Sequence, residues 1–517
     1  MQPLRDLPLF PGLALLFTLF ACGDSGPGGD SDKPTDSDDE ASASSTSAST
    51  NGSTNPTDES TSDGGSGQAS GSDTMSAGPG TDGSTGDDTA ATEATESSTS
   101  VSSDTDSETT GGSICGDGVV EGDEACDDGN EQDLDECAND CTLVPCAQQE
   151  LENPVTALSE TLGYLWVPNS GQDSVSKIDT TTGQEVARYR VKGGEPTRVS
   201  VNLHGDVAVA SRYPGAVTKI LGDPQSCPDT NRNGQVDTSQ GPDELLPLGA
   251  DECVVWTRTI PAPDAPAGPQ AIAWQGGAPD PVTCEFPASK LWVGWLDDNS
   301  TAHIELLDGA DGSTIGEAEV PEWSETWGPA AGVVTVSGDF LVNGADFAPT
   351  VLVDAEDFSI TDLGLPQVSQ CKEDVALDLN GDAWFGDYCN GGASLYDAEA
   401  DEWFNIAGDG GDGVLGVAAD GEGNIWGAGS QPCRLVQIDV ESRAIINDEI
   451  ALPGCAYSLG VSVDFDGDVW VVDRENQELY EVDPDTFQIK HVVSGLVVPF
   501  ALSGMTGVAL MHQHVPG

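Results

Sequence analysis

The residues whose spacing is most specific for chemistry form a nine-residue segment that reads Asp-Thr-Asn-Arg-Asn-Gly-Gln-Val-Asp. Side-chain oxygens recur at its first, third, fifth and ninth positions, and a glycine at the sixth position allows a sharp turn. Loops with this order of residues surround Ca²⁺ with oxygen ligands. We therefore expect a structural calcium site whose ligands are Asp229, Asn231, Asn233, Gln235 and Asp237.

This segment resembles the calcium loops of EF-hand proteins, dockerins and thrombospondin type 3 repeats, but it departs from them at the twelfth position. Gln240 stands there in place of a bidentate glutamate, so Asp243 or Glu244 would have to substitute as a ligand. No helix is evident before the loop. The alternative interpretation is an ordinary insertion that contains a turn rich in Asn and Gly.

Three aspartates recur with a common spacing further along the chain. Asp378, Asp420 and Asp464 each begin an Asp-x-x-Gly-x-x-Trp segment. A ring of such carboxylates would suit a metal ion, yet a structural role explains the whole pattern. The Asn/Asp-Gly tip supplies the positive φ of a tight hairpin, and the Trp packs between neighbouring sheets. We favour the structural interpretation.

These segments belong to a repeat that begins near residue 163. One unit is clearest at residues 415–451, where apolar strands alternate with Gly-containing turns. Alternation with period two and turn signals about every ten residues indicate four short antiparallel strands per unit. A repeat of about 40–50 residues with four strands indicates a β-propeller. We therefore expect an all-β domain over residues 163–511.

Seven candidate first strands predict seven blades. The last of them has no strand after it, and the first Trp-bearing strand, Tyr164–Pro168, has no first strand before it. We therefore expect Thr506–Met511 to pair with Tyr164–Pro168, so that a C-terminal strand closes blade 1 and removes an open sheet edge. The candidate first strands are Thr197–Val201, Gln270–Trp274, Gly332–Val336, Asp374–Asp378, Gly416–Asp420, Gly460–Asp464 and Gly507–Met511.

The Asp-x-x-Gly-x-x-Trp pattern resembles that of NHL-type propellers and of the virginiamycin B lyase family, and three blades match it well. The lyase family is seven-bladed and uses His and Glu with Mg²⁺, with a His as general base near the start of a first strand. Here the corresponding openings, residues 371–374, 412–415 and 456–459, contain no His. The resemblance thus implies the architecture, but the lyase chemistry does not transfer.

Propeller ligands usually bind around the central channel on the face where the first strands begin, which we call the upper face. We favour a non-catalytic binding or structural propeller, with a surface protein or glycan as its ligand. The alternative is an extracytoplasmic lyase or hydrolase of the virginiamycin B lyase-like group, in which Glu373 and Asp374 act with a divalent metal. The candidate ligand contacts are Arg198, Gln270, Glu373, Asp374, Tyr457 and Ser458. The alternative for each is a rim residue that binds no partner.

The thirteen Cys leave an even number once Cys22 is set aside, and an even number favours complete pairing in an exported protein. Strand direction places two pairs at the upper face, Cys371–Cys389 and Cys433–Cys455. On the opposite, lower face three pairings are possible, and our first choice is Cys227–Cys253 with Cys146–Cys284. The last of these bonds would attach a small N-terminal module to the propeller.

Residues 114–146 form that module, with five Cys, eleven acidic residues and no basic residue. Such a short segment cannot build a hydrophobic core, so cross-links must hold it. Its carboxylates suit either another Ca²⁺ or a solvated acidic surface. The module resembles the myxobacterial cysteine-rich repeat, a secreted domain family of unknown function, and the residues that fall on the family's positions are Cys115, Cys126, Cys137 and Cys141.

The N-terminus predicts export and lipid anchoring. Residues 1–22 contain an arginine, an apolar run too short to span a membrane comfortably, and an end that resembles a bacterial lipobox, Leu19-Phe20-Ala21-Cys22. The lipobox implies an acylated Cys22, and an ordinary signal peptide with a chance Cys is the alternative. Residues 23–113 are rich in Ser, Thr, Gly and Asp and form a disordered tether. We expect a surface-exposed outer-membrane lipoprotein that contacts the membrane through its lipid only.

The charge of the chain excludes two classes of partner. Its 517 residues include 17 Lys and Arg against 90 Asp and Glu, which gives a formal net charge of −73. A nucleic-acid partner is excluded because phosphate contacts require a basic face. Attraction to an anionic lipid surface is excluded for the same reason.

Overall fold

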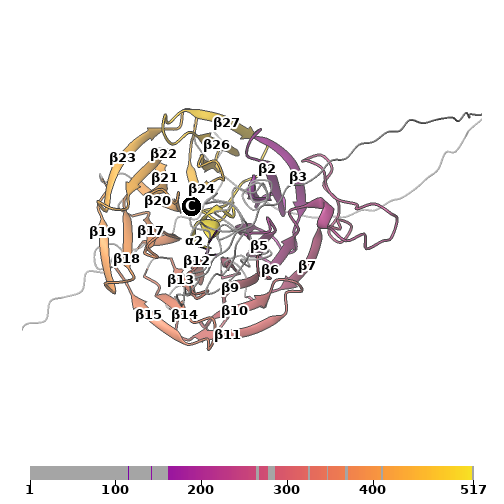
Figure 1. Ribbon diagram of the computed structural model, residues 1–517, viewed down its shortest axis with the longest axis horizontal. Coiled ribbons are helices and arrows are strands. Elements are labelled where there is room, and N and C mark those ends of the chain that lie inside the picture. The colour runs from indigo at the N-terminus through magenta and orange to yellow at the C-terminus, as the bar shows by residue number, and fades with distance from the viewer. Residues whose placement is uncertain are drawn as a thin grey trace, which may run out of the picture. The chain divides into compact units, whose positions relative to one another are not determined.

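The computed structural model describes Cys115, residues 141–142 and residues 161–514, except for 263–266, 278–285, 324–326, 346, 367–370, 390 and 409–411. Among these residues, seven antiparallel sheets stand around a common centre as the blades of a β-propeller (Figure 1). The expected seven-bladed all-β fold is therefore confirmed. The expected signal peptide and tether lie outside the described residues, as do Cys22, Cys126, Cys137, Cys146 and Cys284.

Blades 2 to 7 have four strands each, which run in sequence order from the channel to the rim, and blade 1 has three strands. Blade 1 comprises β1 (Tyr164–Asn169), β2 (Ser174–Asp179) and β3 (Gln184–Arg190), and blade 2 comprises β4 (Pro196–Val201), β5 (Val207–Ser211), β6 (Ala216–Ile220) and β7 (Val254–Thr259). Blade 3 comprises β8 (Ala271–Gln275), β9 (Lys290–Leu296), β10 (Ala302–Asp308) and β11 (Thr314–Val320). Blade 4 comprises β12 (Pro329–Val334), β13 (Phe340–Gly344), β14 (Thr350–Val353) and β15 (Ile360–Gly364). Blade 5 comprises β16 (Lys372–Leu377), β17 (Ala383–Asp387), β18 (Ala393–Asp397) and β19 (Glu402–Ile406). Blade 6 comprises β20 (Asp412–Ala419), β21 (Asn424–Gln431), β22 (Arg434–Asp439) and β23 (Ala444–Ala451). Blade 7 comprises β24 (Ser458–Val463), β25 (Val469–Asp473), β26 (Glu478–Val482) and β27 (Ile489–Ser494).

The recurring Asp-x-x-Gly-x-x-Trp segments form the lower turns of blades 5 to 7. Each Asp accepts hydrogen bonds from backbone N–H groups of its own turn and from the indole N–H of the Trp that follows it. In blade 5, Asp378 accepts from the backbone of Asn380 at 2.8 Å and from Nε1 of Trp384 at 2.9 Å. Asp420 and Asp464 accept from their own tryptophans at 3.0 and 2.7 Å. These carboxylates are structural caps, as the sequence pattern predicts.

The ring is closed at blade 1 by a segment different from the one we expected. β1 pairs with β2 on one side, and residues 497–505 run along its other edge. Pro168 O accepts from the backbone N–H of Phe500 at 3.1 Å, and Trp166 N donates to Met505 O at 2.9 Å. We call residues 497–505 the closing segment.

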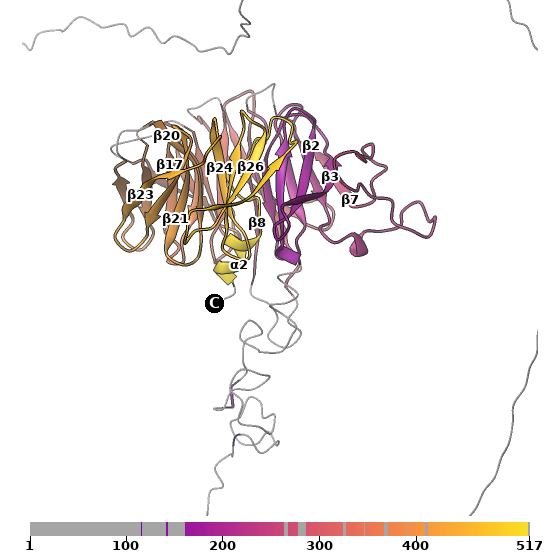
Figure 2. The same ribbon diagram turned by 90° about the horizontal axis from the view of Figure 1, so that it is seen from above.

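The prediction that Thr506–Met511 forms the closing strand was wrong. Residues Val508–His514 form a helix, α2, which lies at the centre of the ring in Figure 1 and at its lower side in Figure 2. A short apolar run has no periodicity that separates a strand from a buried helix, and this explains the error. No helix within the described ranges is long and apolar enough to cross a membrane.

Four disulfides lie among the described residues. Cys371–Cys389 and Cys433–Cys455 are at the upper face. The first joins the residue before β16 to the loop after β17, both in blade 5. The second joins the loop after β21 of blade 6 to the loop before β24 of blade 7. Cys227–Cys253 ties the long insertion between β6 and β7. These three pairs match the expected ones. The fourth bond, Cys115–Cys141, joins two of the cysteines expected to pair within the N-terminal module.

Candidate functional site

Three arginines from two blades surround one phenylalanine at the upper face. Arg198 stands near the start of β4, while Arg212 and Arg474 directly follow the second strands β5 and β25. Their guanidinium carbons lie 5.9, 5.3 and 5.0 Å from the ring centre of Phe500, within the range of cation–π attraction. Phe500 belongs to the closing segment, so this cluster forms only when the ring is closed. We call the three arginines the arginine ladder.

The ladder descends from solvent into the protein. Arg474 is exposed, the side chain of Arg212 is 15% exposed, and Arg198 is only 4% exposed. Arg212 pairs with Glu195 at 3.3 Å. Burial lowers the pKa of Arg198 and of Arg212, because a charged guanidinium loses hydration in the interior.

Asp374, on β16, is the acidic group that most attracts Arg198. Its carboxylate accepts hydrogen bonds from the backbone N–H of Val417 at 3.1 Å and from the hydroxyl of Ser503 at 2.9 Å. Burial raises the pKa of Asp374 to about 6, and the attraction of Arg198 opposes that rise. Asp374 thus links its own blade to the next blade and to the closing segment.

A hollow at the upper face surrounds the two outer arginines of the ladder. Gln270 reaches across it and donates from Nε2 to Trp327 O at 3.0 Å, which fixes one wall. Trp327 itself is partly exposed and lies under Arg212, at 5.7 Å from ring centre to guanidinium. The residues lining this hollow include Arg212, Gln270, Trp327, Glu373, Tyr388, Arg474 and Phe500.

The candidate ligand contacts fall into two groups. Arg198, Gln270, Glu373 and Asp374 line the upper hollow or the channel below it. The half-buried Tyr457 lies beside them, and its pKa is raised by burial and then by the charge of Glu373. By contrast, Ser458 is fully buried and its hydroxyl donates to Gly429 O, so the structure gives it a packing role.

Sequence reasoning missed several residues at this face, namely Arg212, Trp327, Tyr388, Arg474 and Phe500. A usable signal existed for three of them. Second strands end at the upper face, and this rule placed the cysteines after second strands there. Applied to every residue type, the same rule selects Arg212, Tyr388 and Arg474. Phe500 could not be selected, because the closing segment was assigned to other residues.

Several buried polar atoms at this face lack a protein partner in the described part of the chain. On β4 they are the hydroxyl of Thr197 and Nε of Arg198. At the end of β5 they are the hydroxyl of Ser211 and Nε of Arg212. A buried polar atom without a hydrogen bond costs about 1–3 kcal/mol, so such atoms mark places that take up water or a ligand.

A channel cavity of about 100 Å³ lies below the hollow, and Gln270 lines both. Arg198 and Asp374 line the cavity at its upper end. Its walls are the inner faces of first strands and are mostly small and apolar. Helix α2 lines the cavity with Ala509, Leu510 and Gln513, so the lower end is covered.

The described histidines lie away from this site. His204 is in a lower turn, His303 on β10, His491 on β27 and His512 on α2. Among the described residues that line the hollow and the channel there is no His. The His-based arrangement of the lyase family is therefore not found in this part of the structure.

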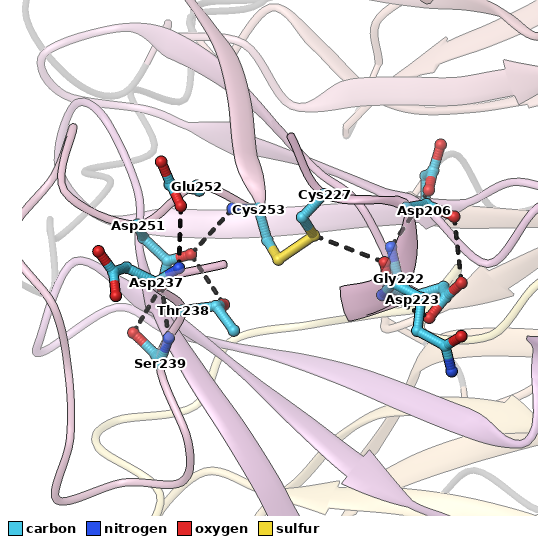
Figure 3. The surroundings of a disulfide bond; sticks show 12 residues. Asp206, Gly222, Asp223, Cys227, Asp237, Thr238, Ser239, Asp251, Glu252 and Cys253 are labelled. Atoms are coloured by element: carbon cyan, nitrogen blue, oxygen red, sulfur yellow. Dashed lines mark hydrogen bonds between the residues drawn. A yellow bond between two sulfur atoms is a disulfide. The ribbon is translucent and has the colours of Figure 1, made fainter. Parts of the chain in front are cut away.

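The calcium-type loop lies in the blade 2 insertion, near the disulfide drawn in Figure 3. Asp229 accepts from the backbone N–H of Gly234 at 2.9 Å, and the amides of Asn231 and Asn233 both point to Asp237, at 2.7 and 2.8 Å. The side-chain oxygens of Asn231 and Asn233 accept from the backbone N–H groups of Asn233 and Gln235, at 3.0 and 2.9 Å. The four side chains with ligand oxygens thus gather in one hydrogen-bonded loop. Gly234 adopts a φ of 90°, which explains the glycine.

Glu252 holds the same loop from its other side. It accepts from the hydroxyl and the backbone N–H of Thr230, at 2.6 and 2.7 Å, and from the backbone of Asn231 and Asp237, each at 2.9 Å. These hydrogen bonds, that of the Thr230 side chain first, lower the pKa of Glu252 to about 2. Because Glu252 precedes Cys253, the disulfide and the carboxylate together fasten the loop to β7.

One family model matches a short region before the propeller. Residues 105–142 match a family model described as a domain of unknown function, DUF4215. That range includes the Cys115–Cys141 disulfide and confirms a cysteine-containing family region before the propeller. No curated protein sequence matches the chain.

Solved propellers resemble the chain in fold. Virginiamycin B lyase from Staphylococcus aureus is 13% identical, over 60% of this chain and 87% of that chain, with a TM-score of 0.42. AztD from Citrobacter koseri in its apo form is 13% identical, over 66% and 97%, with a TM-score of 0.42. A functionally unknown protein from Desulfotomaculum acetoxidans is 9% identical, over 66% and 98%, with a TM-score of 0.46. At these identities the likeness is one of fold alone.

Proposed function

We propose that this protein is a binding lipoprotein of the cell envelope whose propeller holds a ligand at the arginine ladder and catalyses no reaction. The observation that carries the proposal is a set of buried polar atoms on β4 and at the end of β5 that have no partner within the described part of the chain, among them Nε of the almost fully buried Arg198. A folded protein tolerates such atoms where water or a ligand completes them. Their position beside the upper hollow supports a ligand that enters from that face.

The alternative function is a lyase or hydrolase that uses Glu373 and Asp374. One observation favours it, since the pKa of Asp374 is raised to about 6, as expected of a general acid or base. Against it, both oxygens of Asp374 accept hydrogen bonds from neighbouring elements. These contacts support a role in joining blades, and we therefore prefer the binding function.

The envelope location is proposed from the sequence. Acylation of Cys22 followed by a polar tether would display the propeller away from an outer membrane, with no other membrane contact. Cys22→Ser should remain uncleaved by the lipoprotein peptidase and unlabelled by a fatty-acid probe in cells. Equal labelling of the variant and the native protein would contradict the lipid anchor.

Binding is tested with the full-length Cys22→Ser protein as an affinity bait for envelope polysaccharide and protein. We expect a component that is retained by this protein and lost from the variant Arg212→Met with Arg474→Met. Arg190→Met is the matched control, since Arg190 is exposed on β3 of blade 1. A component retained equally by all three proteins would place the ligand elsewhere.

We also propose that the blade 2 loop binds Ca²⁺ as a structural cofactor. The gathering of the Asp229, Asn231, Asn233 and Asp237 side chains in one loop supports this, as does the anchoring of the loop backbone by Glu252. Oxygen-only ligand sets suit Ca²⁺. The remaining expected ligand, Gln235, would contribute its backbone carbonyl, as the seventh position does in loops of this kind.

A further inference from the structure

We propose that the arginine ladder and the channel form one site for a small monocarboxylic acid, whose carboxylate binds Arg198 and whose short apolar body fills the channel above α2. This inference rests on the proposed binding function, because it names the ligand class of the same site. Four features of the site lead to it, namely the order of burial along the ladder, the free Nε of Arg198, the nearby acids and the channel walls.

The order of burial gives an anion a path inward. Arg474 is exposed, Arg212 is mostly buried and Arg198 is buried, and all three lie within 6 Å of the same Phe500 ring centre. Attraction between unit charges grows as the surroundings become less polar. An anion captured at Arg474 therefore gains attraction at each deeper guanidinium, in a chain whose net charge of −73 repels anions elsewhere.

Arg198 is the end of this path and has donor capacity to offer. One of its terminal nitrogens, Nη1, donates to Thr197 O at 3.2 Å, while Nε lacks an acceptor among the described residues. A guanidinium presents its N–H groups as a planar fork that matches the two oxygens of a carboxylate. A carboxylate at this point would satisfy a donor that is otherwise buried without an acceptor.

The acids near Arg198 limit the charge of the ligand. Asp374 and Glu373 both act electrostatically on Arg198, and Arg212 is the remaining charged group that does so. Two carboxylates oppose a second negative charge on the ligand, so a phosphate dianion or a dicarboxylate is disfavoured relative to a monocarboxylate.

The channel limits the size and polarity of the rest of the ligand. Its volume is about 100 Å³. An engineered apolar cavity that binds benzene is larger, at roughly 150 Å³. Its walls are mostly apolar and include Val199, Ala331 and Val417. Polar side chains such as Ser462 and Gln513 line it as well. Because α2 covers the lower end, a ligand must stop within the channel, and a short aliphatic chain fits these limits.

The test uses the full-length protein with Cys22→Ser and a series of straight-chain monocarboxylates from acetate to octanoate. Calorimetry at fixed pH and salt should show affinity that rises over the first few added carbons and then falls once the channel is full. Arg198→Met should weaken the best acid at least tenfold. Arg190→Met, which removes one exposed arginine from blade 1, should leave its affinity unchanged.

A second variant covers the case in which Arg198→Met fails to fold. Ala331→Leu keeps Arg198 and extends a side chain into the channel from β12. It should shift the preferred acid to a shorter chain, which a loss of stability alone would not do. Circular dichroism confirms that each variant is folded before its affinity is interpreted.

The outcomes separate this inference from the proposed function. Equal affinity of every acid for the native protein and for Arg198→Met would overturn the inference. So would the absence of any carboxylate binding while an envelope component is still retained through Arg212 and Arg474, a result that leaves the binding function intact. Absence of both carboxylate binding and retention would overturn the two together.

Discussion

The lower turns of blades 5 to 7 and the upper hollow use buried polar groups in opposite ways. In each lower turn an aspartate accepts from two kinds of donor, and the turn is complete within one blade. At the upper hollow, Arg198 and Arg212 come from blade 2 and retain nitrogens that have no acceptor in the described ranges. Residues that recur from blade to blade thus stabilise the fold, and residues that occur once are the ones available to a ligand.

The two faces are also held together differently. The lower turns are short hairpins whose own hydrogen bonds fix them. Loops at the upper face of blades 5 to 7 are instead cross-linked by Cys371–Cys389 and Cys433–Cys455. A cross-link restricts a loop that has few internal hydrogen bonds and keeps the rim of the hollow in place.

Opening the ring should have the largest effect on both faces at once. Deleting residues 495–517 removes the closing segment, its hydrogen bonds to Trp166 and Pro168, and Phe500 beneath the ladder. An exposed strand edge on β1 promotes aggregation. We expect loss of cooperative thermal unfolding and a shift to aggregates in size-exclusion chromatography.

Deleting only residues 508–517 is the matched control for this truncation. It removes α2 and uncovers the lower end of the channel, but it leaves the hydrogen bonds of the closing segment to β1. This shorter deletion should remain monomeric and unfold cooperatively. If the longer deletion behaves the same way, the closing segment does not hold the ring.

Adding Ca²⁺ tests whether the blade 2 insertion binds an ion, just as the upper hollow is proposed to bind a ligand. An ion that binds only the folded state stabilises it by about 2.7 kcal/mol at a hundredfold excess over Kd. Ca²⁺ should therefore raise the Tm, and Asp229→Ala with Asp237→Ala should abolish that rise. Glu441→Ala, an exposed acid of blade 6, should respond as the native protein does; identical responses of all three would place the ion elsewhere.

Removing a lower cap should cost stability without affecting ligand binding. Asp378→Ala removes the carboxylate that accepts from the indole N–H of Trp384 and from the backbone N–H groups of Asn380 and Asp382. We expect a loss of about 2 kcal/mol in urea unfolding. Asn380→Ala, at an exposed position of the same turn, should change stability by less than about 0.5 kcal/mol. A cap variant as stable as this control would remove the distinction between the faces.

The smallest expected effect is a pH dependence that belongs to the upper face. The pKa of Asp374 is about 6 in the folded protein and 3.8 without the fold, and burial is the main cause. The folded state therefore binds the proton more tightly, and stability rises as pH falls from 7 towards 4. For this one group the gain between pH 7 and pH 5 is about 1 kcal/mol.

Asp374→Asn should lack that part of the pH dependence, as measured by urea unfolding at both pH values. Protonation of other carboxylates changes the stability of both proteins. The quantity to compare is therefore the slope of the unfolding free energy against pH, in the native protein and in the variant. Equal slopes for the native protein and the variant would show that Asp374 is not desolvated at the ladder.

Much of the fold followed from local patterns. Period-two alternation and repeated Gly turns act within about ten residues, so the strands, the seven blades and the role of Asp378, Asp420 and Asp464 were predictable. Strand direction was enough to pair Cys371 with Cys389. The calcium-type loop, too, was visible as a spacing of oxygen-bearing residues, although its occupancy remains a prediction.

The site depended on contacts between parts of the chain that lie far apart. Residues 197–212 and Phe500 meet because the chain returns to its starting blade, and no local signal showed which C-terminal residues would do so. Periodicity also left open whether Val508–His514 is a strand or a helix. Propensity and alternation act along the chain, whereas burial of Arg198, the pKa of Asp374 and the covered channel arise from side chains that seven blades bring to one centre.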